Sequence, residues 1–317
     1  MIDYDPHDWD SHLFDIRGSM VREILGRVMT CVAWSAVVVL LYQFPFLKWI
    51  AIPSILHSLV GLALGLLLVF RTTAAYDRYW EGRKLWGSIT NESRNLARGA
   101  SVLLAANPAR VNSILLYAQI FPFAVMARLC NLAHFGPPGS RIPKSEVEEA
   151  LKSPSPPLYF ARRITQILAQ SRDEKLISSY EFVNIDNNVQ LLIDYYGGCE
   201  RIHLTPLPFP YMVHLRRALI LYCFTLPFAL VREFNWGTIL DTLIIAYIFF
   251  GIEEIGVEIG DPFGHDDNDL PLEDFCRGIE RGLQAFMIID PDAEPETSPR
   301  PQAPPTPELD PIPIDGA

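Results

Sequence analysis

The sequence contains few of the residue arrays that mark enzymes and metal-binding proteins. Its five cysteines are far apart and form no C-x-x-C pair, so neither a zinc site nor a disulfide framework is indicated. Its seven histidines form no H-x-x-H or H-E-x-x-H array, and the chain has no G-x-S-x-G, P-loop or G-x-G-x-x-G motif. We therefore predict that the protein is not an enzyme and requires no cofactor.

Positive charge is also scarce. The 26 Lys and Arg residues are outnumbered by 37 Asp and Glu residues, and the net charge of -11 argues against nucleic acid as a partner. The first residues, MIDYDPHDWD, are acidic where a secretory signal peptide would be basic, so no cleaved signal is expected. Hydrophobic residues make up 50% of the 317 positions and concentrate in two blocks, which favours a membrane protein over a large soluble domain.

The first hydrophobic block predicts two membrane-spanning helices, Val28–Trp49 and Ile50–Phe70. Basic residues cluster beyond both outer ends of this hairpin: Arg17, Arg22 and Arg27 before it, and Arg71, Arg78, Arg83 and Lys84 after it. The positive-inside rule therefore places both outer ends in the cytosol and the turn near Pro45–Pro53 outside.

The second hydrophobic block predicts two shorter spans, Ala218–Val231 and Gly237–Ile252. Arg216 and Arg217 can snorkel at the cytosolic end of the first of these and lengthen it. A buried helical hairpin in a soluble protein is the alternative interpretation, and the first pair of spans disfavours it. The fold class we predict is an all-α membrane protein with four transmembrane helices, a helical cytosolic domain and both termini in the cytosol.

Polar, helix-periodic sequence separates the two blocks. We expect helices at Trp86–Ala106, Val111–His134, Lys144–Leu151, Tyr159–Gln170 and Asp173–Tyr196. Arg128 would cost about 2.5–3.5 kcal/mol inside a membrane, so Val111–His134 is predicted to be a buried core helix. The run Gly197-Gly198-Cys199 is predicted to be a helix C-terminus rather than the site of a catalytic cysteine.

These patterns divide the chain into six parts. They are an N-terminal cytosolic segment (1–27), a transmembrane hairpin (28–80), a cytosolic helical domain (81–210) with a loop insertion (136–157), a second transmembrane hairpin (211–256), an acidic loop with a cytosolic helix at Leu272–Ile289 (257–289), and a disordered Pro-rich acidic tail (290–317).

The stretch Ile55–Trp86 contains no proline and predicts one helix that runs from the membrane into water. A small-residue stripe with a G-x-x-x-G at Gly61 and Gly65 would let another backbone come close. Beside it, Leu62, Leu66 and Phe70 would stack as apolar rings about 6 Å apart if several copies surrounded an axis. Such a constriction can gate ions by dewetting. The alternative is that these residues face lipid or fill a core.

Two further features have competing interpretations. The acidic stretch Asp261–Asp269 offers the clustered oxygens that hard cations prefer, but it lacks the spacing of an EF-hand loop. A solvated loop or a set of helix caps is the alternative. His57, within a predicted span, is either a hydrogen-bonded packing residue or a source of pH sensitivity.

The run FRTTAAYDRYWEGRKLWG, Phe70 to Gly87, closely resembles the signature of the bestrophin family of ion channels. Three further runs also resemble that family: RGSMVREILGR (Arg17 to Arg27), CERIHLTPLPFPY (Cys199 to Tyr211) and DPFGHDDNDL (Asp261 to Leu270). Their order and spacing cover nearly the whole chain except the 136–157 insertion and the tail.

The resemblance implies a homopentamer around one central pore, with four membrane helices per subunit. It implies a pore neck at Leu62, Leu66 and Phe70, the stripe described above. It also implies a second, cytosolic constriction, the aperture, at Val183, with Ile185 as the alternative position.

Animal members of the family bind calcium through an acidic clasp at the match to this chain's acidic stretch. That would make Asp261, Asp266, Asp267 and Asp269 calcium-ligand candidates. His265 stands where a carboxylate is expected and a proline follows the cluster, which disfavours calcium activation. We therefore expect no resident metal.

Ion selectivity is left open by the neck, because leucine dehydrates ions of either sign. Animal and plant members of the family conduct chloride and other anions, whereas some bacterial members favour cations. An acidic surface repels anions, but helix N-termini aimed at a pore can bind them. We predict a chloride-conducting pentameric channel in the cell membrane. The alternatives are a cation-selective relative and a non-conducting membrane scaffold whose acidic tail recruits partners.

Overall fold

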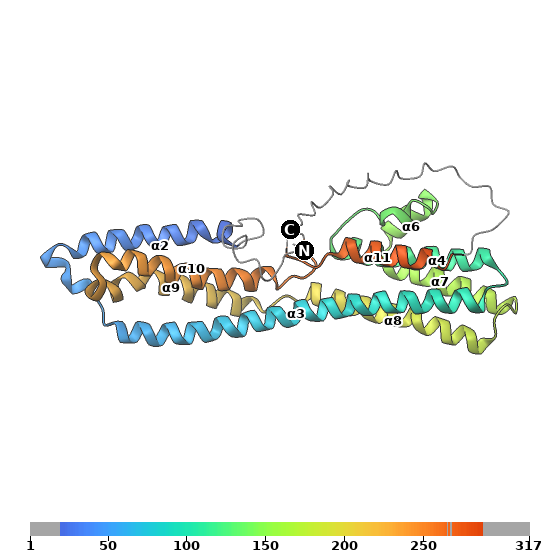
Figure 1. The fold of residues 1–317 in the computed structure, drawn as a ribbon, viewed down its shortest axis with the longest axis horizontal. Coiled ribbons are helices and arrows are strands. Elements are labelled where there is room, and N and C mark those ends of the chain that lie inside the picture. The colour runs from blue at the N-terminus through green and yellow to red at the C-terminus, as the bar shows by residue number, and fades with distance from the viewer. Residues whose placement is uncertain (1–19, 265, 267, 288–317) are drawn as a thin grey trace, which may run out of the picture.

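A single 50-residue helix, α3 (Ser54–Leu103), runs most of the length of the molecule (Figure 1). The computed structural model describes residues 20–264, 266 and 268–287, and this part of the chain contains helices and no strand. The other α-helices are α2 (Val21–Tyr42), α4 (Pro108–Leu129), α5 (Gly136–Gly139), α6 (Lys144–Lys152), α7 (Pro156–Asp173), α8 (Ser179–Leu204), α9 (Phe209–Phe234), α10 (Thr238–Glu258) and α11 (Leu272–Gln284), and two short 3-10 helices are η1 (Pro45–Ile50) and η2 (Asn235–Gly237).

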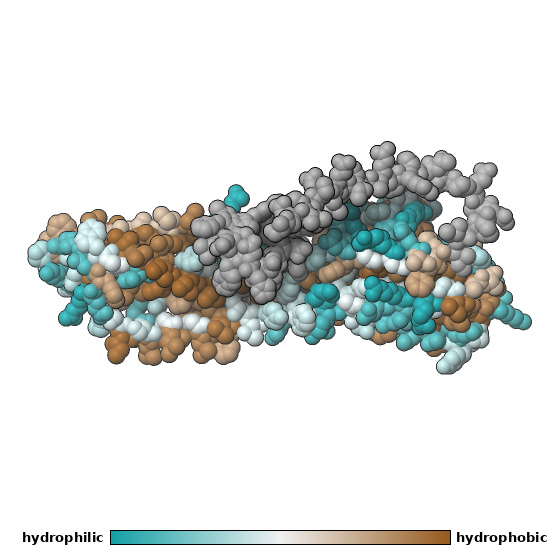
Figure 2. Space-filling model, in the orientation of Figure 1, coloured by the Kyte–Doolittle hydropathy of each residue, from teal (hydrophilic) through white to brown (hydrophobic). Residues whose placement is uncertain are grey.

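The helices form two bundles that share α3. In the first bundle, α9 and α10 pack on the N-terminal half of α3 and α2 packs on α9 and α10, around Val28, Leu68 and Leu219. In the second bundle, α4, α8 and α11 pack on the C-terminal half of α3 and α7 packs on α4 and α8, around Trp86 and Phe121. Figure 2 shows hydrophobic surface over much of the first bundle and a more hydrophilic surface over the second. The first bundle therefore has the surface of a membrane domain.

The continuity of α3 is greater than the sequence indicated. The helix predicted for Ile55–Trp86 and the one predicted for Trp86–Ala106 are one helix, which crosses the predicted domain boundary at residue 80 without a break. Its span contains no proline, and the chain leaves the helical conformation at Leu104. The two bundles are therefore joined by a stiff element rather than by a loop.

Three of the described helices are long and apolar enough to cross a membrane, namely α2, the apolar part of α3, and α4. In α4, 72% of the apolar window is buried, because α4 lies in the second bundle against α7, α11 and α3. This agrees with its prediction as a core helix. The spans predicted at Ala218–Val231 and Gly237–Ile252 lie within α9 and α10, which are not among the three but pack beside α2 and α3.

Helix ends differ from prediction for local reasons. The helix predicted at Val111–His134 begins earlier, where the Asn107 side chain accepts a hydrogen bond from the backbone N–H of Arg110, and ends at Leu129. Asn131 follows with a left-handed φ of 54°, which stops the helix. The prediction for α6 is confirmed, and α11 ends at Gln284, before the predicted end. Residues 1–19 of the predicted N-terminal segment and the predicted 290–317 tail lie outside the described residues.

The prediction that Gly197-Gly198-Cys199 ends a helix is wrong. These residues lie inside α8, which starts at a capping box between Ser178 and Glu181 rather than at Asp173. Gly198 serves packing: a Cβ on it would lie 2.8 Å from a methyl carbon of Leu85 on α3. Small size at this point lets α8 approach α3 closely.

Candidate ion-conducting site

The three neck candidates lie on the exposed face of α3. Leu62, Leu66 and Phe70 are 74%, 56% and 59% exposed in the single chain. At about 100° per residue, this face is opposite the one that carries the buried Leu64 and Leu68. The subunit therefore packs one side of α3 and leaves a continuous apolar stripe on the other. These exposed apolar side chains must contact lipid, contact another subunit or line a dewetted lumen.

A tight contact with α9 fixes the rotation of α3 near its N-terminal end. The His57 ring stacks on Tyr222 with a centroid distance of 4.5 Å, and its Nε2 lies 3.1 Å from the Tyr222 carbonyl oxygen. A Cβ on Gly61 would lie 2.6 Å from the Tyr222 hydroxyl, whereas nothing lies within 4 Å of one on Gly65. His57 is a packing residue in this subunit. Among the described residues, Gly61 of the G-x-x-x-G is in close contact with another helix and Gly65 is not.

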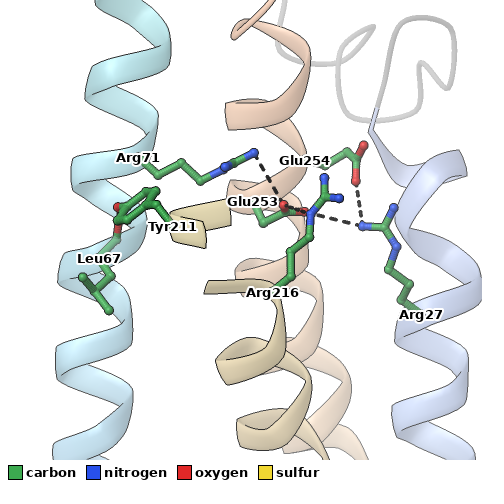
Figure 3. A network of polar contacts seen from close by, with 7 residues as sticks. All are labelled: Arg27, Leu67, Arg71, Tyr211, Arg216, Glu253 and Glu254. Atoms are coloured by element: carbon green, nitrogen blue, oxygen red, sulfur yellow. Dashed lines mark hydrogen bonds and ion pairs between the residues drawn. The ribbon is translucent and has the colours of Figure 1, made fainter. Parts of the chain in front are cut away.

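An arginine–glutamate cluster lies one residue beyond the neck stripe (Figure 3). We use this name for Arg27 of α2, Arg71 of α3, Arg216 of α9, and Glu253 and Glu254 of α10. Glu253 lies 2.9 Å from Arg216 Nε, 3.6 Å from Arg71 Nη2 and 3.6 Å from Arg27 Nη1. Arg27 Nη1 also lies 2.7 Å from Glu254 Oε2. Four helices are thus joined at one level.

The cluster has more positive than negative charge, with three guanidinium groups against two carboxylates. Arg71 and Glu253 are almost fully buried, and within the described residues Arg71 Nε and Nη1 make no hydrogen bond. A buried charge is stable only when it is paired, so Arg71 depends on Glu253. The cluster therefore fixes the position of α3 directly below Phe70. These residues lie in separate segments of the sequence, and no motif there indicates their association.

Arg78, inside the signature run, clamps the junction between the two bundles. Its guanidinium donates to three backbone carbonyl oxygens: Gly260 at 2.9 Å, Ile202 at 2.8 Å and Thr205 at 2.5 Å. These carbonyls belong to the C-terminal end of α8 and to the segment after α10, where helical hydrogen bonds stop. Arg78 thus satisfies exposed helix ends and ties them to α3.

The structure separates the two aperture candidates. Val183 on α8 is 64% exposed, whereas Ile185 is 1% exposed and belongs to the core of the second bundle. Because Ile185 fills the interior of the subunit, its side chain cannot line a passage between subunits. The aperture prediction therefore depends on Val183.

The acidic stretch is built as a turn rather than as an open set of ligands. The Asp269 carboxylate is buried and accepts a hydrogen bond from the backbone N–H of Asp266 at 2.7 Å. Burial raises the pKa of Asp269 to about 6. The pKa of Glu258 is also raised by burial, and its carboxylate accepts a hydrogen bond from Asn268.

The three calcium-ligand candidates that the structure describes do not converge. Asp261 and Asp266 are exposed, Asp269 is turned toward the backbone, and Asp267 and His265 lie outside the described residues. Within residues 20–264, 266 and 268–287, no group of three or more His, Cys, Asp or Glu side chains is placed to hold a metal ion. The described residues therefore do not fit a calcium site.

Cys199 has the environment of a structural thiol. It is buried in the second bundle, and burial raises its pKa to about 12. A thiol is nucleophilic only as thiolate, so Cys199 is unsuited to covalent catalysis.

Comparison with known proteins agrees with the architecture. A family described as bacterial and fungal bestrophin proteins matches residues 1–285. The chain belongs to the bestrophin family. A voltage-dependent anion channel-forming protein of Nostoc sp. is 40% identical over 296 residues, which cover 90% of this bestrophin and 93% of the relative. A protein of the same description from Escherichia coli K12 is 30% identical over 282 residues, covering 87% and 90%.

Solved structures extend the similarity to three dimensions. The crystal structure of a bacterial bestrophin homologue from Klebsiella pneumoniae matches this bestrophin with a TM-score of 0.79 at 31% identity. The match covers 83% of this chain and 98% of the other. The all-helical fold predicted from the sequence is therefore confirmed. It is the fold of the bestrophins, which are membrane proteins.

Proposed function

We propose that this bestrophin assembles as a homopentamer whose five α3 helices enclose a pore that conducts chloride and other anions. The observation that carries the proposal is the exposed apolar stripe of Leu62, Leu66 and Phe70. The stripe faces away from the subunit's own core along a helix that is held in place at both ends of the stripe. Five copies around an axis would turn these side chains into three apolar rings.

The names of the relatives support anions as the permeant ions, since both bacterial relatives above are described as anion channel-forming. Apolar rings impede ions because water leaves a narrow hydrophobic passage, so the neck would act as a gate. Val183, exposed on α8, is the residue proposed for the aperture in the second bundle. The channel would need no bound metal, and the second bundle and both termini would lie in the cytosol.

A cation channel is the second candidate, favoured by one specific side chain. Below Phe70, the exposed face of α3 continues through Thr73 to Asp77, which is also exposed. Five carboxylates at that level would attract cations and repel anions.

The test is a planar-bilayer recording of the purified full chain in a tenfold potassium chloride gradient, with calcium and with a chelator. An anion channel reverses near the chloride equilibrium potential, about 59 mV from zero for a tenfold gradient at 25 °C. Reversal near the potassium potential would favour the cation channel. Protein that is monomeric and non-conducting would favour the scaffold and overturn the proposal.

A further inference from the structure

A cavity of about 380 Å³ opens between α2, α9 and α10, beside the arginine–glutamate cluster. Arg27, Arg216 and Glu253 line one end of it, and the rest of the lining is mostly apolar and includes Ile220, Phe224 and Phe250. The cavity is therefore charged at one end and apolar at the other. It lies apart from the neck stripe, because the cavity is lined by helices other than α3.

On both α9 and α10, the charged residue lies at the same end of the cavity and the apolar residues lie toward the other end. On α9, Arg216 is followed by Ile220 and then Phe224, which lies about 12 Å further along the axis at 1.5 Å per residue. On α10, which runs the opposite way, Phe250 precedes Glu253. All of the apolar wall thus lies toward the middle of the first bundle, and the charge lies at the level where the hydrophobic surface ends. This is the polarity profile of one leaflet of a bilayer.

The charged end has capacity for an anion. Arg27 and Arg216 are the exposed members of the cluster, with side chains 45% and 48% exposed. Arg216 donates to Glu253 through Nε, and within the described residues its terminal amino groups make no hydrogen bond. Because the cluster holds three cations and two anions, one added negative charge would balance it. Guanidinium groups are well suited to phosphate oxygens.

We propose that this cavity binds one anionic phospholipid of the cytosolic leaflet. Its phosphate would lie against Arg27 and Arg216, and part of one acyl chain would lie along Ile220, Phe224 and Phe250. The volume is near the lower end for ligand pockets, about 300–1,000 Å³, so the rest of the lipid lies on the outer surface. The inference rests on the proposed membrane orientation but not on conduction. The bound lipid would tie α2 to α9 just below the level of the neck.

The test counts lipids bound to the purified full-length protein by native mass spectrometry, in titrations with phosphatidylglycerol and with phosphatidylcholine of the same chain length. We expect phosphatidylglycerol to bind about tenfold more tightly, because both lipids carry a phosphate but the choline cation of phosphatidylcholine cancels the net negative charge that would balance the cluster. Arg216→Gln should weaken phosphatidylglycerol binding by a similar factor. Arg217→Gln removes a neighbouring exposed arginine that does not line the cavity and should leave binding unchanged.

Arg216→Gln also removes a partner of buried Glu253, so a second variant leaves the cluster intact. Ile220→Trp fills the apolar part of the cavity and should abolish preferential phosphatidylglycerol binding. Leu221→Trp, at an exposed neighbouring position that does not line the cavity, is its matched control.

Retention of wild-type phosphatidylglycerol binding by Ile220→Trp would overturn the proposal, as would equal binding of both lipids. Displacement of the lipid by equimolar inorganic phosphate would assign the site to a free anion instead. The lipid count needs no ion current, so failure of this inference and failure of the channel proposal are distinguished.

Discussion

Arg216 of α9 donates from Nε to Oε1 of Glu253 on α10 at 2.9 Å, and this bond holds the centre of a four-helix ionic network. Glu253 is the common partner of Arg27, Arg71 and Arg216. The position of α3 below the neck therefore depends on one buried carboxylate.

Replacing that carboxylate should destabilise the first bundle. Glu253→Gln leaves Arg71 buried without its counter-ion, a change that typically costs about 3–5 kcal/mol. The measurement is the thermal unfolding midpoint of the purified protein in detergent. Glu273→Gln, which breaks the exposed pair with Arg277 on α11, is the control and should leave the midpoint unchanged. Equal midpoints for both variants would contradict the role given to Glu253.

Widening the neck should raise the current without unfolding the subunit. Changing Leu62, Leu66 and Phe70 together to Ala removes side chains that are exposed in the single chain, so the fold loses little packing. The measurement is single-channel conductance in planar bilayers, after size-exclusion chromatography shows an unchanged oligomer. Val60→Ala, exposed on another face of α3, is the control and should leave conductance unchanged. Unaltered current in a well-assembled triple variant would refute the neck.

The two glycines of the G-x-x-x-G should respond differently to a methyl group. Gly61→Ala places Cβ against the Tyr222 hydroxyl. Because Tyr222 is buried and stacked on His57, the clash can be relieved only by moving these packed side chains or helices α3 and α9 apart. We expect a loss of about 1–3 kcal/mol, seen as a lower unfolding midpoint. Gly65→Ala has space within the chain and should leave that midpoint unchanged. A lost oligomer in Gly65→Ala would indicate that Gly65 packs against a second subunit.

The acidic turn should make stability depend on pH. Burial raises the pKa of Asp269 from 3.8 to about 6, so the folded protein keeps this proton at a pH where the unfolded chain has released it. The stabilising contribution is present below about pH 4 and is lost as pH rises through about 6, by up to about 3 kcal/mol. With a chelator present, the unfolding midpoint should therefore fall between pH 5 and pH 7. Asp269→Asn should flatten this fall, and an unchanged slope would contradict the assignment.

Most helices could be predicted from the sequence because apolar periodicity and the absence of proline are local properties. The exposed stripe on α3 was predicted correctly in its spacing, but spacing alone could not say which face the subunit buries. The aperture illustrates the same limit. Val183 and Ile185 are two residues apart and therefore face different sides of α8, and only packing shows which side is exposed.

The arginine–glutamate cluster was beyond the reach of sequence reasoning for a different reason. Arg27 and Glu254 are 227 positions apart, and no motif links them. The glycines at 197–198 led to a wrong prediction of a helix end, because glycine is common both at helix ends and where two helices touch. Contact with Leu85 decides between these uses, and that contact exists only in the folded chain.

The unbroken course of α3 has a mechanical consequence. Leu62 lies about 36 Å from Trp86 along the same rod, at 1.5 Å per residue, and no proline between them offers a joint. If the rod pivots by about five degrees at Trp86, the neck side chain swings by about 3 Å, close to the diameter of a water molecule. In the proposed pentamer, a tilt of the second bundle would therefore change the width of the proposed neck.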